Sequence, residues 1–296
     1  MSHIKLKTGY YSDVRLVALL KNDVYVEKIY GKKVIISEQT SAVLFKYFQE
    51  YQQKARQLEI NICETKYNKI IRGSIDTYSY IVELQTFIEK NFESLLLKEK
   101  NASTLKKYIV QYLVFFQKVW SANFPIALDP ATRNFGIDEK GVLIFFDFFP
   151  PHQKKESSNY FLWPEPPLND RKYFIQRYFT HQQVMVIYAQ LIKCIVKNKY
   201  ISPSEIRRLI KDVLGDIAYK IIIIPNSLRS KIIMDPLPQH MDTLRSIAGE
   251  LCYENKISYN QLLSVYKNSH ISGQNQLPTQ NKLKLISNIL RKHLTS

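Results

Sequence analysis

Three side chains with oxygen ligands lie close together in one stretch of the chain. Asn134 follows Asp129 by five residues, and Asp147 follows Asn134 by thirteen. Carboxylate and amide oxygens suit Mg²⁺, which proteins commonly hold with one or two carboxylates while phosphate groups and water complete the coordination. Two carboxylates and one amide supply ligands of this kind, and phosphoryl transfer is one reaction that needs such a cation beside phosphate groups.

The residues between Asn134 and Asp147 predict a β-hairpin. Residues 135–137 are expected to form a short strand, residues 138–141 a turn with the sequence Asp-Glu-Lys-Gly, and residues 142–146 an apolar return strand. Such a hairpin brings the chain back to its starting side, so Asp147 is expected beside Asn134. A chance order of Asp and Asn around a buried strand is the structural alternative.

The combination of Asp-x4-Asn, a hairpin with an Asp-x-x-Gly turn and a second Asp resembles the catalytic loop and the metal-binding Asp of the protein-kinase-like superfamily. The resemblance implies that Asp129 orients the acceptor hydroxyl group and takes its proton. It implies that Asn134 and Asp147 bind Mg²⁺, with ATP or another nucleoside triphosphate as the donor. The sequence is more similar to small-molecule kinases of the aminoglycoside-phosphotransferase type than to protein kinases, because two Phe follow Asp147 in place of Phe-Gly.

The resemblance also implies an α+β fold with two lobes. Residues 1–84 are expected to form a small nucleotide-binding lobe with an antiparallel sheet and one helix, and residues 85–296 a larger, mostly helical lobe. The local patterns agree, because they predict three short strands within residues 4–36 and two more within 58–82. They also predict a long helix over residues 105–121 that leads into the Asp-x4-Asn loop.

The resemblance assigns phosphate contacts to the small lobe. Ser12 belongs to a loop over residues 9–13 that would cover the phosphates, although it has one Gly where protein kinases have three. Lys28, near the end of the third expected strand, would contact the α- and β-phosphates. Glu38, in the first turn of the next helix, is the favoured partner of Lys28, with Glu50 as the alternative. A Glu at the start of a helix can also act only as a cap.

Adenine recognition and the catalytic loop complete the assigned site. The backbone of Glu83, Leu84 and Gln85 would form hydrogen bonds with the adenine ring. Arg133 would pair with a substrate or phosphate anion. Ala127 stands where the family usually has a His that braces the catalytic loop.

The second half of the chain predicts an irregular segment followed by helices. Residues 148–172 are expected to form a proline- and aromatic-rich loop on the acceptor side. Residues 173–196 predict one long helix, and a capping box at Ser202 predicts another that Gly215 ends. The basic helix expected over residues 282–294 could contact a membrane surface, but docking on its own domain is favoured.

Composition limits the class of protein. The net charge is +16, from 42 Lys and Arg against 26 Asp and Glu, and such a charge attracts polyanions. The abundance of Lys, Ile, Asn and Tyr together, with no dense basic run, favours genome composition as the cause, so nucleic acid is not the expected partner. Cys63, Cys194 and Cys252 are far apart and odd in number, which is typical of reduced thiols and a cytoplasmic location.

We therefore expect an ATP- and Mg²⁺-dependent phosphotransferase that acts on a hydroxyl group of a sugar, an aminoglycoside-like compound or a lipid-linked acceptor. Two alternatives remain open. One is a catalytically weak, pseudokinase-like binding or scaffold protein, and the other is a basic protein associated with nucleic acid. Turnover, binding without turnover and steeply salt-dependent nucleic-acid binding would distinguish them.

Overall fold

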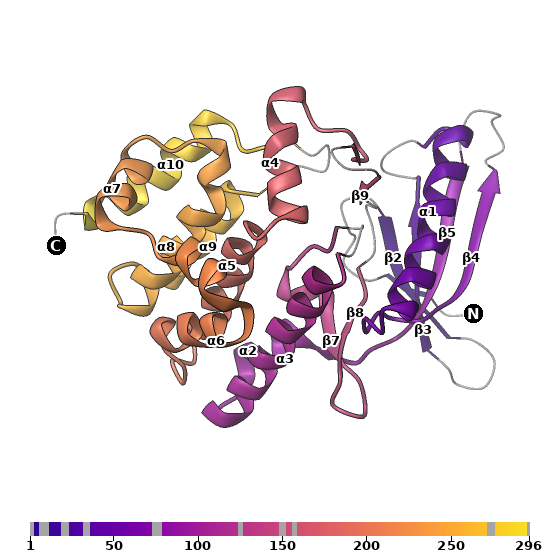
Figure 1. Ribbon diagram of the computed structural model, residues 1–296, viewed down its shortest axis with the longest axis horizontal. Coiled ribbons are helices and arrows are strands. Elements are labelled where there is room, and N and C mark those ends of the chain that lie inside the picture. The colour runs from indigo at the N-terminus through magenta and orange to yellow at the C-terminus, as the bar shows by residue number, and fades with distance from the viewer. Residues whose placement is uncertain are drawn as a thin grey trace.

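The chain has an α+β fold in which antiparallel sheets occupy the N-terminal part and helices fill the C-terminal part (Figure 1). The sheet with helix α1 lies at one end of the molecule, where the N-terminus is found, and the C-terminus lies at the opposite end. This computed structural model describes residues 3–5, 12–18, 24–31, 36–72, 79–123, 127–147, 152–155, 159–270 and 276–294.

The main sheet has five antiparallel strands in the order β1-β2-β3-β5-β4. The strands are β1 (His3–Lys5), β2 (Ser12–Ala18), β3 (Val24–Tyr30), β4 (Thr65–Arg72) and β5 (Ser79–Thr86). The three strands and the later pair that the sequence predicted are therefore confirmed. Because β5 continues to Thr86, the predicted domain boundary after residue 84 falls inside this strand.

Helix α1 (Glu38–Gln57) covers one face of the sheet beside β4 and β5 (Figure 1). It begins where predicted, because the Ser37 side chain caps it by accepting a hydrogen bond of 3.1 Å from the backbone N–H of Thr40. Its buried face includes Leu44 and Phe48, and the ring of Phe48 lies 6.3 Å from that of Tyr30 on β3. The helix and the sheet thus share one apolar core.

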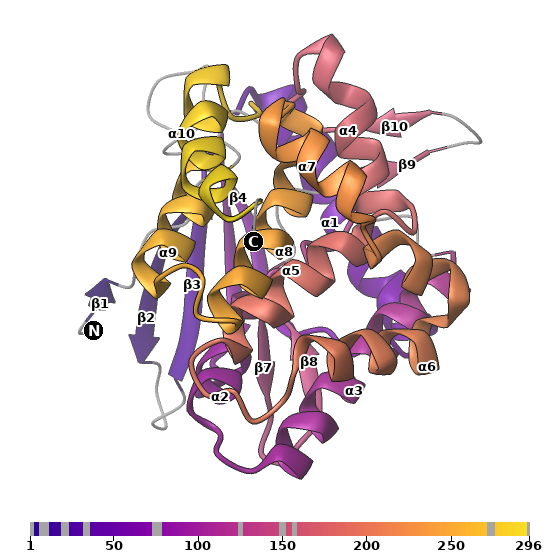
Figure 2. The ribbon, with the colours of Figure 1, turned by 90° about the vertical axis from the view of Figure 1, so that its left-hand side faces the viewer.

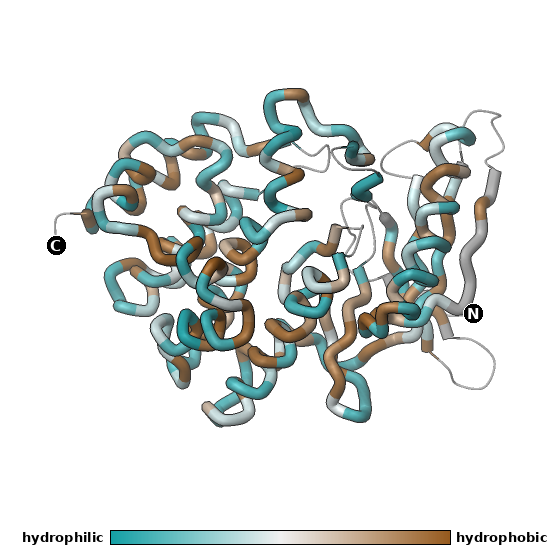
Figure 3. Tube along the Cα trace, in the orientation of Figure 1, coloured by the Kyte–Doolittle hydropathy of each residue, from teal (hydrophilic) through white to brown (hydrophobic). Residues whose placement is uncertain are grey.

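The predicted hairpin forms from β7 (Phe135–Ile137) and β8 (Leu143–Phe145), and β6 (Lys90–Asn91) pairs with β7. At the turn, the Asp138 carboxylate accepts hydrogen bonds from the backbone N–H groups of Lys140 and Val142, at 2.9 and 2.8 Å. Gly141 has φ of +78°, a conformation that glycine adopts without strain. The hairpin is hydrophobic along its strands and hydrophilic at its turn (Figure 3).

An aromatic cluster anchors this hairpin to the helical part. Phe135 on β7 lies at the centre of the cluster, with 5.0 Å between its ring and that of Phe145 on β8. The other rings around Phe135 come from the helices, at 5.1–6.4 Å between ring centroids: Phe92, Tyr112, Phe115 and Phe116. Edge-to-face contacts of this kind fix relative orientation, so the hairpin ends are held firmly on the helical part.

The helical part is built around α5, in which every residue except Lys193 is buried. Helix α5 contacts α2, α4, α6 and α8, and Figure 2 shows it in the middle of the helical layer. The helices are α2 (Phe92–Lys98), α3 (Ala102–Ser121), α4 (Leu168–Phe179), α5 (Gln183–Ile195), α6 (Pro203–Ile222), α7 (Asn226–Met234), α8 (Met241–Tyr253), α9 (Tyr259–Asn268) and α10 (Gln280–Leu290).

The single helix predicted over residues 173–196 is wrong, because the chain breaks between α4 and α5. Thr180 adopts an extended backbone conformation, with φ of −130° and ψ of 170°. Its hydroxyl donates to the carbonyl of Gln176 at 2.6 Å and accepts from the N–H of Gln182 at 3.1 Å. These local side-chain bonds compete with the helical ladder, and the break allows α4 to leave the direction of α5.

Gly215, which was predicted to end its helix, has φ of +88° and ends only the first part of α6, because a second helical part continues after the kink to Ile222. The prediction for the C-terminal helix is confirmed. Helix α10 docks on its own domain, because Leu283, Ile286 and Leu290 are buried and the Ser287 hydroxyl donates to the carbonyl of Ile233 on α7 at 2.6 Å. Within the described ranges, no helix is both long and apolar enough to cross a membrane.

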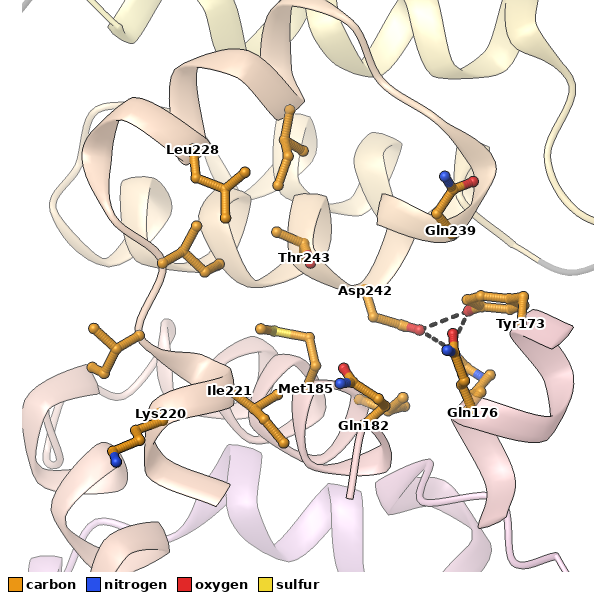
Figure 4. Close-up of a pocket in the computed structure, with 15 residues that line it drawn as sticks. Tyr173, Gln176, Gln182, Met185, Lys220, Ile221, Leu228, Gln239, Asp242 and Thr243 are labelled. Carbon is orange, nitrogen blue, oxygen red and sulfur yellow. Dashed lines mark hydrogen bonds and ion pairs between the residues drawn. The ribbon is translucent and has the colours of Figure 1, made fainter. Parts of the chain in front are cut away.

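A buried ionic cluster joins α4 to α8 beside a cavity of about 320 Å³ (Figure 4). Asp242 pairs with Arg177 and, at 2.9 Å, with Arg245, and the hydroxyl of Tyr173 donates to it at 2.8 Å. Burial acts to raise the pKa of the Asp242 carboxyl, but the two guanidinium groups hold that pKa below its ordinary value. The cluster is thus stable only while Asp242 keeps its charge.

Asp242→Asn is expected to lower the free energy of unfolding by about 3–5 kcal/mol, because two buried guanidinium groups lose their shared counter-charge. Urea denaturation measures the effect. The matched control is Asp216→Asn, which breaks an exposed pair with Lys211 at 3.7 Å and is expected to cost about 0–1 kcal/mol. Equal losses in the two variants would show that the buried cluster does not stabilise the helical part.

Candidate functional site

The hairpin places Asn134 and Asp147 at the same end of two paired strands. Asn134 ends the short 3₁₀ turn Thr132–Asn134 directly before β7, and Asp147 lies two residues after the end of β8. The backbone N–H of Phe146 donates to the carbonyl of Asn134 at 3.0 Å, which fixes the two segments side by side. Asn134 is buried, whereas the Asp147 side chain is 35% exposed. The predicted return of Asp147 to Asn134 is confirmed.

Asp129 lies on the loop that leads into this turn. Its carboxylate accepts a hydrogen bond of 3.2 Å from the N–H of Ala131, and the Asn134 side-chain amide lies 3.4 Å from the carbonyl oxygen of Asp129. Burial and the negative charge of Asp129 raise the pKa of the Asp147 carboxyl, while the positive charges of Lys28 and Arg133 act in the opposite direction. The two carboxylates therefore repel each other, and a bound cation would relieve this repulsion.

Lys28 connects the main sheet to the hairpin. Its ammonium group donates to the carbonyl of Phe146 at 2.7 Å and lies 3.7 Å from the Asp147 carboxylate. The Lys28 side chain is only 8% exposed, so it does not point freely into solvent. The structure thus brings Lys28, from the main sheet, together with Asp129, Asn134 and Asp147, which the sequence analysis selected from one later stretch of the chain.

The two carboxylates of α1 that were expected to pair with Lys28 are both exposed. Glu38 is exposed at the first turn of α1, and Glu50 is exposed and pairs with Lys46 at 3.7 Å. The carboxylate that faces Lys28 from the sheet belongs to Glu83 on β5, because Lys28 and Glu83 are directly opposite in the antiparallel register. Sequence reasoning assigned only the backbone of Glu83 to the site and missed its side chain.

The Glu83 side chain is completely buried and receives hydrogen bonds from three strands. The hydroxyl of Tyr30 donates to it at 3.0 Å, the hydroxyl of Thr65 donates at 3.1 Å, and the side-chain amide of Gln85 also donates to it. Burial raises the pKa of the Glu83 carboxyl, while the positive charge of Lys28 acts in the opposite direction. Burying the Glu83 carboxyl group without hydrogen-bond partners would cost free energy. The three hydrogen bonds supply those partners.

The other residues assigned to the nucleotide occupy the same sheet. The backbone of Glu83, Leu84 and Gln85 lies in the central strand β5, paired on both sides with β3 and β4, so the sheet already uses its hydrogen-bonding groups. Ser12 is the first residue of β2 and lies opposite Tyr30. The remainder of the assigned phosphate loop, residues 9–11, lies outside the described residues.

Three side chains brace the loop that carries Asp129. The hydroxyl of Tyr112 donates to the carbonyl of Pro130, and the Gln183 amide donates to the carbonyl of Leu128 at 2.7 Å. On the other side of the turn, the Asn91 amide donates to the carbonyl of Arg133 at 3.0 Å. These three contacts hold the backbone of the loop and of the turn in place.

Thr132, within the turn, is held by a partly buried charge pair. Its hydroxyl donates to Glu93 at 3.1 Å, and Lys193 pairs with Glu93 at 2.8 Å. The Lys193 charge and these hydrogen bonds hold the pKa of Glu93 below its ordinary value, although burial acts to raise it. The Arg133 side chain is exposed, so it remains accessible to an anion beside the site.

An aromatic group around His152 lies close enough to Asp129 for the charge of Asp129 to act on His152. His152 is buried, its ring lies 5.2 Å from that of Tyr178 and 6.4 Å from that of Phe174, and its carbonyl accepts from the N–H of Ala127 at 2.8 Å. Burial lowers the pKa of His152 to about 3, although the Asp129 charge acts in the opposite direction. His152 is therefore neutral at physiological pH. Together with Phe174 and Tyr178 it forms an uncharged aromatic wall.

No protein-family model matches this chain, and no match was found among curated proteins. In the part of the chain that the structure describes, no group of three or more His, Cys, Asp or Glu side chains could hold a metal ion. The site contains two carboxylates and one amide, so a cation bound here would need further oxygen ligands from another molecule, such as a nucleotide or water.

Proposed function

We propose that this protein is an ATP- and Mg²⁺-dependent phosphotransferase of the protein-kinase-like superfamily that acts on a hydroxyl group of a small molecule. The supporting observation is the convergence of Lys28, from the sheet, with Asp129, Asn134 and Asp147, from the hairpin and its loop. In this proposal the sheet with α1 is the nucleotide-binding lobe, and the helical part is the catalytic and acceptor-binding lobe.

Asn134 and Asp147 are the proposed ligands of Mg²⁺, because both offer hard oxygen donors at one end of the hairpin. The ion would neutralise charge on the transferred phosphoryl group. Lys28 supplies a second positive charge from the opposite wall, beside Asp147. The Asp147 carboxylate and the Lys28 ammonium therefore hold each other in position for a phosphate-bearing ligand.

Asp129 is the proposed carboxylate that orients the acceptor hydroxyl group and receives its proton. The bond from the N–H of Ala131 uses one of its oxygens, and the bracing contacts of Tyr112 and Gln183 keep its loop in place. A general base needs such fixed placement within hydrogen-bond reach of the proton that it takes. The neutral aromatic wall around His152 is the proposed acceptor side.

The proposed adenine contact lies at later residues than the sequence analysis expected. Because the backbone of residues 83–85 belongs to the centre of the sheet, we assign the adenine contact to residues 87–89. These residues connect β5 to β6, where the chain passes from the sheet to the helical part.

The direct test is transfer of the γ-phosphate of labelled ATP, in the presence of Mg²⁺, to a panel of hydroxyl compounds that includes sugars, aminoglycosides and lipid-linked glycans. Formation of a phosphorylated acceptor supports the proposal. Binding of Mg²⁺-ATP without transfer to any acceptor favours a pseudokinase-like binding protein. Absence of nucleotide binding contradicts both functions.

Lys28→Met is expected to weaken Mg²⁺-ATP binding, because a charge-assisted contact to phosphate is lost. Such contacts are worth about 1.5–3 kcal/mol, which corresponds to roughly 10- to 100-fold in affinity. Isothermal titration calorimetry measures the change. Lys46→Met is the matched control, because Lys46 is exposed on α1 and pairs only with Glu50. Equal affinities for the Lys28 variant and the wild type would remove Lys28 from the site.

A further inference from the structure

Helix α1 presents no acidic side chain to the core. Over residues 38–57, all of which are described, the buried positions are Ser41, Leu44, Phe48, Tyr51, Gln52 and Ala55. The two acidic residues of α1, Glu38 and Glu50, are both exposed. A buried Lys on the third strand of a kinase-like sheet nevertheless needs a fixed carboxylate to align it with the phosphates.

Glu83 is placed to supply that carboxylate. It lies directly opposite Lys28 in the antiparallel pair β3–β5, and residues in this relation have Cβ atoms roughly 4.5–5.5 Å apart on the same face of the sheet. Both residues are buried. The positive charge of Lys28 also acts on Glu83, since it opposes the rise in the pKa of the Glu83 carboxyl that burial causes.

The Glu83 carboxylate cannot turn away from this face without losing its other contacts. Tyr30 on β3, Thr65 on β4 and Gln85 on β5 all donate to it. Tyr30 and Lys28 lie two residues apart on β3 and therefore point to the same side of the sheet. Three adjacent strands thus fix the direction of the carboxylate relative to the Lys28 ammonium.

We propose that Glu83 is the positioning residue for Lys28, in place of a carboxylate on helix α1. The inference rests on the proposed phosphotransferase function and concerns how its site is controlled. When the partner of the Lys is on a helix, movement of that helix switches the site on and off. Because Glu83 and Lys28 belong to neighbouring strands of one sheet, Lys28 keeps its alignment whatever the position of α1, and the site needs no helix movement to become competent.

The test is a double-mutant cycle in the full chain, with Mg²⁺-ATP affinity, KM for ATP and kcat as the measurements. Loss of a residue that orients another typically costs about 10- to 100-fold, so Glu83→Gln is expected to weaken Mg²⁺-ATP binding and raise the KM for ATP within that range, with a smaller change in kcat. In the Lys28→Met background, Glu83→Gln is expected to add no more than about twofold, because coupled residues are not additive. Glu50→Gln, an exposed change on α1, is the matched control and is expected to leave the affinity unchanged.

The outcomes separate the two proposals. If the wild type does not bind Mg²⁺-ATP, the phosphotransferase proposal and the role of Glu83 fail together. If the wild type binds but Glu83→Gln has wild-type affinity, or its loss is fully retained in the Lys28→Met background, the role of Glu83 alone is overturned. A larger loss in Glu38→Gln than in Glu83→Gln would restore the helix as the source of the carboxylate.

If Glu83→Gln does not fold, Glu83→Asp replaces it. This change keeps the charge but withdraws the carboxylate by one methylene group from Lys28. A loss of affinity that disappears in the Lys28→Met background supports the positioning role. Wild-type affinity for Mg²⁺-ATP in Glu83→Asp overturns it.

Discussion

Asp147→Asn is expected to abolish Mg²⁺-dependent nucleotide binding while the fold remains intact. The amide keeps the shape of the side chain but removes the charge that would attract the metal ion. Loss of a group that stabilises charge in the reaction typically lowers turnover by ~10²–10³-fold. The fold is expected to tolerate the change because the Asp147 side chain is 35% exposed and the amide has nearly the same shape.

Calorimetric titration with ATP, with and without Mg²⁺, measures the effect of Asp147→Asn. Asp212→Asn, on the exposed face of α6, is the matched control and is expected to behave like the wild type. Thermal unfolding monitored by circular dichroism checks that both variants are folded. Unchanged Mg²⁺-ATP affinity in a folded Asp147→Asn variant would contradict the metal assignment.

The elements that position the site follow from local sequence patterns. Alternating apolar residues and short polar turns were sufficient to predict β3, which carries Lys28, and the hairpin that joins Asn134 to Asp147. The break of the helix at Gly215 was also predicted, because it depends on the conformational preference of one residue, although the second helical part after it was not. Local chemistry determines these features, so a single sequence reveals them.

The partners of the site residues depend on contacts between distant segments. Glu83 faces Lys28 only because β5 inserts between β3 and β4 in one particular register, and a single sequence does not show strand order or register. Gln183 braces the carbonyl of Leu128 from a helix that begins more than fifty residues later. The break at Thr180, in contrast, depends on local hydrogen bonds of its side chain. It was missed because apolar residues recur at helical spacing on both sides of Thr180, which predicts one continuous helix.

The loop that carries Asp129 is braced by residues that lie far from it in the sequence. The resemblance to kinases would place a bracing His where this chain has Ala127. In the structure, Tyr112 from α3 and Gln183 from α5 hold the carbonyl groups of the same loop. Bracing needs donors at fixed points of the backbone, and any rigid neighbouring element can provide them. A motif-based comparison therefore underestimates how well this loop is ordered.

Asp129→Asn is expected to lower phosphoryl transfer while leaving Mg²⁺-ATP affinity close to that of the wild type. A positioned general base contributes typically ~10²–10⁴-fold to the rate, and the amide cannot accept the proton of the acceptor hydroxyl group. The affinity is expected to persist because Lys28, Asn134 and Asp147, which would hold the nucleotide and the ion, are unchanged. The measurements are single-turnover transfer from labelled ATP and calorimetric binding.

The Asp129 variant also distinguishes catalysis from nucleotide binding alone. Equal transfer rates for Asp129→Asn and the wild type would exclude the proposed kinase-like mechanism. A wild type that binds Mg²⁺-ATP but phosphorylates no hydroxyl acceptor would leave Asp129 without a catalytic role and favour the pseudokinase-like function. A loss of both transfer and affinity would place Asp129 among the metal ligands, since Asn134 already approaches its carbonyl oxygen. A loss of transfer with retained affinity assigns Asp129 to the acceptor side of the reaction, where it would orient the hydroxyl group and receive its proton, because neither role contributes to nucleotide binding.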